Sequence, residues 1–164
     1  MMALMTALPN VRVTVMCTYN LLSMPSFKDY ILDMGKLKAG YGYRYAPDGH
    51  LEKIRDRLHL DFPFLRYPEF ISMYLAQGYE PAEQWLDDSI KAAQQMGYSA
   101  GEVDAIIRLK NTFLGDKPWS DEYRKVKEND FIKYINEYDK RRGTNFEETY
   151  PELMELKNAI ERRH

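Results

Sequence analysis

The stretch LHLDFPFLRYPEFISMY, residues 58–74, decides how the rest of this 164-residue chain is interpreted. Its first residues alternate between apolar and polar side chains, as in a β-strand with one buried face: Leu58, Leu60 and Phe62 against His59 and Asp61. Pro63 follows immediately, and it either ends the regular pairing or places the strand at an edge or a bulge. After the corner at Arg66, residues 70–76 are expected to form a second short extended run.

A strand and a helix are predicted upstream of this stretch. Residues 11–17, VRVTVMC, alternate β-branched and polar side chains and predict a strand. Ser26 can cap a helix in which apolar residues recur at helical spacing over 27–37. The Tyr/Gly-rich residues 40–50 are expected to form a loop. A strand, a helix and a second strand form one unit in which the two strands lie parallel.

From Pro81 onward the sequence predicts helices separated by glycine and proline breaks. Ser99 and Glu102 have the spacing of a capping box, and Gly143 is well placed to end a helix. The predicted fold class is therefore α/β: a partial (half) β/α barrel of two or three strands, followed by a helical C-terminal region. Residues 1–78 would contain the strands and their helix, and residues 79–164 would pack on them in one structural unit.

Composition narrows the classes of function and the compartment. The formal net charge of −2 gives no broad electrostatic reason to expect nucleic acid or an anionic membrane as a partner. The one cysteine, Cys17, has no internal disulfide partner and cannot by itself hold an iron–sulfur cluster. No apolar run approaches the length of a transmembrane helix. We expect a soluble, cytoplasmic protein.

Polar residues follow both predicted strands. Asn20 and Ser23 come after the first strand and Arg66 after the second. In α/β folds ligands bind at the carboxyl ends of the strands, where a fixed guanidinium can clamp a carboxylate. The alternatives are structural: Asn20 and Ser23 as turn caps, and Arg66 in a salt bridge with Glu69 or Asp61.

His59 and Asp61 lie two residues apart on the same strand and therefore on one face. Such a pair can bind a metal or relay a proton, and a metal-dependent hydrolase is one hypothesis. The alternative is a simple hydrogen-bonded pair at the surface. The sequence contains no Walker loop, glycine-rich dinucleotide turn, HExxH or CxxC to support a more specific activity, and no metal ligands are predicted.

Three stretches together resemble radical SAM proteins of the twitch-domain group. They are VRVTVMCTYNLLSMPSFKDYILD (11–33), LHLDFPFLRYPEF (58–70) and FIKYINEYDKRRGTNFEETYPEL (131–153). The first is similar to a late strand, loop and helix of that group, and the second to its D-x-P-[YF]-L-R-[YF]-P corner. The third is similar to its C-terminal D-x-R-R-x-T-[ND]-F and [FY]-P-E elements. Their order and spacing extend the resemblance over about residues 11–155.

The resemblance implies a partial barrel that binds a 4Fe-4S cluster and S-adenosylmethionine (SAM), which the reduced cluster cleaves to a deoxyadenosyl radical. In that family the cluster cysteines, CxxxCxxC, belong to the first barrel loop, upstream of the strand that Val11 begins here. Cys17 matches none of them. We therefore expect the C-terminal half of such an enzyme, inactive alone, encoded by a truncated gene, as a split subunit or as a separate module.

The resemblance also assigns site residues. Asn20, Ser23, Asp61 and Arg66 match positions that face the cofactor, while catalytic residues stay unknown. The tail motif either binds a ligand or locks the tail onto the barrel, and locking is favoured; its matching residues are Asp139, Arg141, Arg142 and Asn145. Expected partners are an N-terminal half chain that carries the cluster cysteines, or a second copy. The alternative function is a non-catalytic interaction module that pairs through exposed strand edges.

Overall fold

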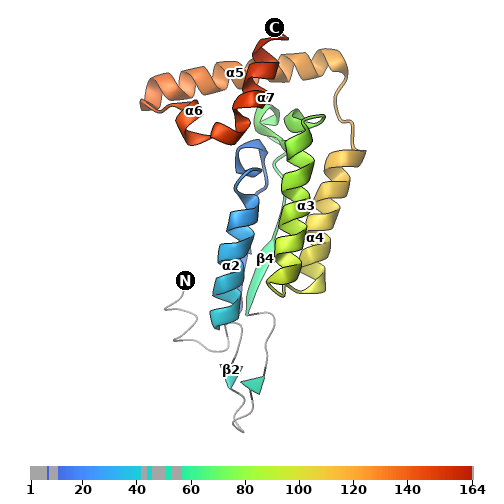
Figure 1. Cartoon of the computed structure of the whole chain (residues 1–164), viewed down its shortest axis with the longest axis vertical. Coiled ribbons are helices and arrows are strands. Elements are labelled where there is room, and N and C mark those ends of the chain that lie inside the picture. Colours follow the sequence, from blue (N-terminus) through green and yellow to red (C-terminus); the bar gives the residue numbers. More distant parts are fainter. Residues whose placement is uncertain (1–6, 8–10, 42–43, 46–50, 53–56, 164) are drawn as a thin grey trace.

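The computed structural model of the chain describes residues 7, 11–41, 44–45, 51–52 and 57–163 (Figure 1). Most of them are helical. In this part of the chain the larger sheet has two parallel strands, β1 (Val13–Met16) and β4 (Leu58–Asp61), and α2 (Phe27–Tyr41) lies between them in sequence. The α/β character that the sequence predicts is confirmed at this level. That the two strands belong to a larger barrel stays a prediction.

β1 and β4 pair in register from Val13 with Leu58 to Met16 with Asp61. The pairing continues beyond the strands, where the Tyr19 amide donates to the Pro63 carbonyl (2.7 Å). Pro63 has no N–H to donate, but its carbonyl still serves the ladder, so the proline does not end the pairing. Alternation in the sequence therefore located both strands correctly.

β2 (Arg44–Tyr45) lies within residues 40–50, where the sequence predicted a loop, and pairs antiparallel with β3 (Leu51–Glu52). The expectation of a second extended run at residues 70–76 is wrong. The chain instead forms two turns of 3-10 helix, η2 (Glu69–Ile71) and η3 (Met73–Ala76). All four residues of η3 are buried, whereas a strand would present alternate residues to opposite faces.

The C-terminal region is helical, as predicted. Its elements are α3 (Glu80–Gln95), α4 (Ala100–Gly115), α5 (Asp121–Arg142), α6 (Phe146–Thr149), η4 (Pro151–Leu153) and α7 (Met154–Glu161). The predicted capping box is present, because the Ser99 hydroxyl accepts from the Glu102 amide and the Glu102 carboxylate accepts from the Ser99 amide. Gly143 ends α5 with a left-handed φ of 64°.

The core begins between the sheet and the helices that run beside it, α2, α3 and α4 (Figure 1), and continues into α5–α7 through residues such as Phe131 and Leu156. Leu58, Leu60 and Phe62 contribute the buried face of β4. α2 comes very near the end of α3: a Cβ on Gly35 would lie 2.8 Å from the Met96 Cβ, so a side chain has no room there. None of the helices in the described ranges is long and apolar enough to cross a membrane.

The α5–α7 region lies across the end of the molecule at which β1 and β4 finish (Figure 1). It reaches the sheet through the segments that follow each strand. The short helix η1 (Leu21–Ser23), which follows β1, packs on η3, and α5 packs on η2 and η3. The carboxyl ends of the strands are thus framed by the C-terminal helices.

Candidate functional site at the carboxyl ends of the strands

One face of the β1–β4 sheet is exposed in the described part of the chain. His59 and Asp61 lie on this face, as the sequence predicts, because the buried residues of β4 alternate with them. Their register partners on β1 are Thr14 and Met16. Met16 is 67% exposed, so a large apolar residue lies on this open face. The sheet therefore has a free surface with mixed polar and apolar character.

The His59–Asp61 pair does not assemble into a metal centre with other ligands. The His59 Nδ1 lies 3.7 Å from the Glu102 Oε1 at the edge of β4. Among the residues that the structure describes, no group of three or more His, Cys, Asp or Glu side chains is placed to hold a metal ion. No contact in this part of the chain supports the hydrolase hypothesis.

Asn20 and Ser23 form hydrogen bonds with each other and with the backbone of η1. The Asn20 Oδ1 accepts from the Leu22 amide (2.9 Å) and from the Ser23 amide (3.3 Å). The Ser23 hydroxyl oxygen in turn accepts from the Asn20 amide at 3.0 Å. Both residues therefore cap η1, the structural alternative that the sequence left open. A contact of either residue with a cofactor stays a prediction.

Arg66 is exposed and forms neither of the salt bridges considered from the sequence. Its guanidinium carbon lies 5.1 Å from the centre of the Phe64 ring, a cation–π contact. Glu69 is instead bound by the Tyr123 hydroxyl (2.6 Å) and by the Lys127 Nζ (3.2 Å). Within the described residues the guanidinium has no hydrogen-bond acceptor, so its donors are available to a ligand.

A pocket of about 310 Å³ opens beside Arg66. Its lining residues are Phe64, Arg66, Glu69, Ser72, Tyr74, Asp116, Pro118 and Trp119. The Tyr74 hydroxyl donates to Asp116 (2.9 Å). Burial, and then the hydrogen bond to Asp116, raise the pKa of Tyr74 to about 12, so the phenol keeps its proton at neutral pH. The pocket thus combines aromatic walls with the Arg66 guanidinium and with two carboxylates, Glu69 and Asp116, that are already bonded to neighbouring side chains.

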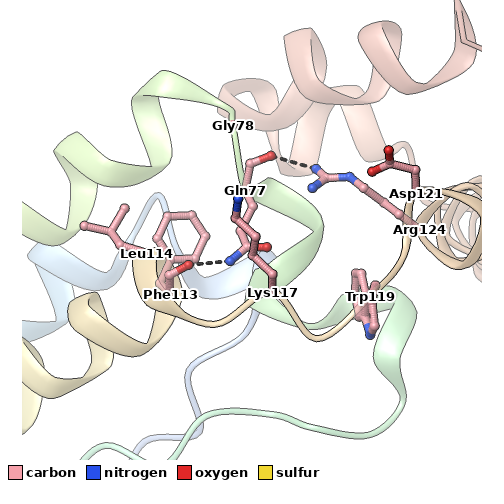
Figure 2. A pocket seen from close by; sticks show the side chains of 8 residues that line it. All are labelled: Gln77, Gly78, Phe113, Leu114, Lys117, Trp119, Asp121 and Arg124. Atoms are coloured by element: carbon pink, nitrogen blue, oxygen red, sulfur yellow. Dashed lines mark hydrogen bonds between the residues drawn. The ribbon is translucent and has the colours of Figure 1, made fainter.

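A second pocket, of about 370 Å³, shares Trp119 with the first, and Figure 2 shows the residues that line it. The Gln77 amide nitrogen donates to the carbonyls of Phe113 (2.5 Å) and Asp116 (2.6 Å). Arg124 donates to the Gln77 carbonyl at 2.7 Å, and Figure 2 shows its side chain pointing at that carbonyl. These bonds fix the wall of the pocket and the linker that carries Trp119.

Sequence reasoning missed Trp119 and Asp116. Both lie in the linker between α4 and α5, more than fifty residues after β4, the strand whose rim they complete. The feature in the sequence that could have pointed to them is Trp119 beside Pro118 in a short polar linker. This feature is too common to assign a role to either residue. The site therefore depends on tertiary contacts between segments that the sequence places far apart.

The residues of this chain do not fit a 4Fe-4S cluster. Cys17 continues β1 on the side that faces the helices and is half-buried. Burial raises the pKa of its thiol, although a hydrogen bond with Tyr30 acts in the opposite direction. A raised pKa disfavours the thiolate that ligates metal. What the arrangement can do is bind an anion with a planar part, through Arg66 and the aromatic walls.

No family model, no curated protein and no solved structure matches this chain.

Proposed function

We propose that this chain supplies the closing strands of the partial barrel of a radical SAM protein of the twitch-domain group. In this proposal the outer edge of β1 pairs with a strand of the part that binds the cluster. The resemblance of residues 11–33, 58–70 and 131–153 suggests the family. The observation that carries the proposal is that the two outer edges of the β1–β4 sheet differ.

The outer edge of β4 is closed by side chains. The Lys38 Nζ donates to the Leu58 carbonyl (2.5 Å), and the Leu60 amide donates to the Glu102 Oε1 (2.9 Å). Lys38 and Glu102 also form an ion pair at 2.7 Å, with side chains 11% and 0% exposed. A further strand cannot pair here without breaking this buried ion pair, so β4 suits the last position of a sheet.

The outer edge of β1 is open in the described part of the chain. The amides of Val13 and Cys17 donate to β4, so the peptide groups of Thr14 and Met16 point away from it. Val15 faces the helices with Val13 and Cys17, yet all three are only half-buried, because nothing described covers them beyond β1. An unpaired edge beside a half-buried apolar row suits the addition of a strand.

The pocket beside Arg66 supports a role for this chain at the rim of the assembled barrel. Arg66 would bind a carboxylate of SAM or of the substrate, and Asp61 would face the interior. The cluster and SAM supply the radical chemistry when bound. This chain would orient the ligand and exclude water from one side.

A second candidate is a non-catalytic module that uses the same β1 edge to bind another protein or a second copy. The open edge and the exposed Met16 favour it as directly as they favour the barrel. It differs from the first proposal in requiring neither iron nor SAM.

Reconstitution distinguishes the two candidates. The chain is mixed anaerobically with a polypeptide that carries the CxxxCxxC half, and the mixture is assayed for iron-dependent absorbance, for deoxyadenosine from SAM, and for mass by light scattering. SAM cleavage that requires both components supports the barrel. A stable complex or dimer without cleavage supports the module. A monomer that binds neither partner contradicts both.

A further inference from the structure

A small pocket of about 160 Å³ lies between the C-terminal helices and Leu22 of η1, and we call it the tail pocket. Its walls come from the last turns of α5, from α6 and from the residues around them. They are Leu22, Tyr134, Ile135, Tyr138, Asp139, Thr144, Phe146, Thr149 and Tyr150. Most of these residues belong to the tail motif and its surroundings, to which the proposed function gives no role.

Asp139 fixes the turn that forms one wall of the tail pocket. Its Oδ1 accepts from the Thr144 hydroxyl (2.7 Å) and its Oδ2 from the Phe146 amide (2.8 Å). Asn145 caps α6 by accepting from the Glu147 amide (2.9 Å). The locking role favoured from the sequence thus has a structural basis for Asp139 and Asn145. It does not explain why a pocket is left open behind the turn.

The charge of the tail pocket is negative. Asp139 is the one lining residue with a formal charge, and both of its oxygens accept from neutral donors. No ion pair joins it to a basic side chain in the described part of the chain. Lys140, Arg141 and Arg142 follow it in sequence but are exposed, and Arg141 pairs with Glu137. A cation in the pocket would therefore find an uncompensated carboxylate.

Four aromatic residues, Tyr134, Tyr138, Phe146 and Tyr150, form a large part of the wall. The Tyr134 and Tyr138 ring centres lie 5.9 Å apart, and those of Phe146 and Tyr150 lie 5.2 Å apart, with both pairs inclined by about 40°. Burial, and then the neighbouring phenols Tyr138 and Tyr134, raise the pKa of Tyr150, so its hydroxyl stays neutral. The faces of such rings carry partial negative charge and attract cations.

We propose that the tail pocket binds a small organic cation with a methylated ammonium head. A tertiary or quaternary ammonium spreads its charge over methyl groups, so it loses little hydration on entering an aromatic pocket and gains cation–π contact with several rings. An anion would be repelled by Asp139. An uncharged ligand of the same shape would gain apolar contact alone. This proposal does not depend on the radical SAM assignment.

Calorimetric titration of the full chain with choline tests the proposal. The matched probe is the uncharged carbon analogue of choline, in which a tert-butyl group replaces the trimethylammonium group with nearly the same shape. We expect choline to bind with about millimolar affinity, and the analogue to bind at least tenfold more weakly. Equal binding of the two probes overturns the proposal, because it would show an apolar pocket without preference for charge.

Two variants at one exposed position connect the binding to the rings. Tyr138 is 45% exposed, so its replacement should not disturb the fold. Tyr138→Phe keeps the ring and should bind choline within about threefold of the natural chain, while Tyr138→Leu should lose about tenfold. Equal affinity in both variants overturns the involvement of the ring, and the absence of choline binding to the natural chain up to about 10 mM overturns the site itself.

Discussion

The Lys38 Nζ on α2 lies 2.7 Å from the Glu102 Oε1 on α4, and together the two side chains occupy the outer edge of β4. Each also bonds a peptide group of the strand that would otherwise face a neighbour. The buried ion pair thus satisfies outward-facing peptide groups of β4 that a further strand would otherwise bond. The outer edge of β4 is therefore occupied, whereas that of β1 is open in the described part of the chain. The orientation of any assembly through this sheet follows from that inequality.

Removal of Glu102 should be costly. Glu102→Ala leaves the Leu60 amide without an acceptor and the buried Lys38 ammonium without its carboxylate partner, so we expect the free energy of unfolding to fall by about 3–5 kcal/mol. The matched control is Asp33→Ala, which removes an equally short pair between Asp33 and Lys36 (2.7 Å) whose side chains are more than 70% exposed. There we expect a change within about 0.5 kcal/mol. Urea unfolding measures both, and equal losses would contradict the edge-closing role.

The Glu102 carboxylate should also make the stability of the chain depend on pH. Burial alone would raise the pKa of Glu102, but hydrogen bonds from Lys38, the Leu60 amide and Ser99 together outweigh it and hold the pKa below its ordinary value. Its stabilising contribution is therefore full above the unfolded pKa of about 4.3 and is lost as the pH falls through the lower folded value.

We expect the natural chain to lose stability below about pH 5 more steeply than Glu102→Gln, which has no carboxylate to protonate. Thermal melting between neutral and acid pH measures the two slopes. Parallel curves would show that other acids dominate the acid unfolding of the chain.

The sequence located the elements that depend on residues close to one another in the chain. The two-residue alternation in 11–17 and 58–62 identified both strands, because one face of each strand is buried. The Ser99–Glu102 capping box could be recognised because its two residues lie three positions apart at the start of a helix. What the sequence did not show is that the Glu102 carboxylate also bonds Lys38 and the Leu60 amide, which lie 64 and 42 residues away in the chain.

The predictions that failed depend on contacts between segments that lie far apart in the sequence. Residues 70–76 look suitable for a strand, but none of the described strands pairs with them, and they form 3-10 turns on either side of Ser72. Arg66 was given acidic neighbours in sequence as partners, yet Glu69 turns to Tyr123 and Lys127 on α5. The rim of the candidate site therefore became visible only with the tertiary contacts of the α4–α5 linker.

Proline substitution distinguishes the open side of β1 from its paired side. The Thr14 amide points away from β4, so Thr14→Pro removes no described hydrogen bond but blocks an added strand. The Val13 amide donates to the Arg57 carbonyl (2.7 Å), so Val13→Pro breaks the ladder. We expect the monomer to tolerate Thr14→Pro within about 1 kcal/mol and to lose at least about 2 kcal/mol with Val13→Pro.

In a pull-down against the cluster-binding half, or in light scattering for self-association, Thr14→Pro should abolish pairing although the chain stays folded by circular dichroism. Retention of the complex by this folded variant would place the interface elsewhere.

Arg66 offers a test of the ligand site that is separate from stability. Its guanidinium is exposed and contacts the Phe64 ring, so Arg66→Gln should change the free energy of unfolding by less than about 1 kcal/mol. In the reconstituted protein we expect this variant to bind SAM about tenfold more weakly, because one charge-assisted bond to a carboxylate is lost. Arg141→Gln, which removes an exposed guanidinium far from the strand ends in sequence, is the control and should bind SAM normally. Arg66→Lys keeps the charge but loses the planar fork, so an intermediate affinity would indicate bidentate binding. If Arg66→Gln binds SAM as tightly as the control, the carboxylate is held by another residue and the pocket beside Arg66 is not the SAM site.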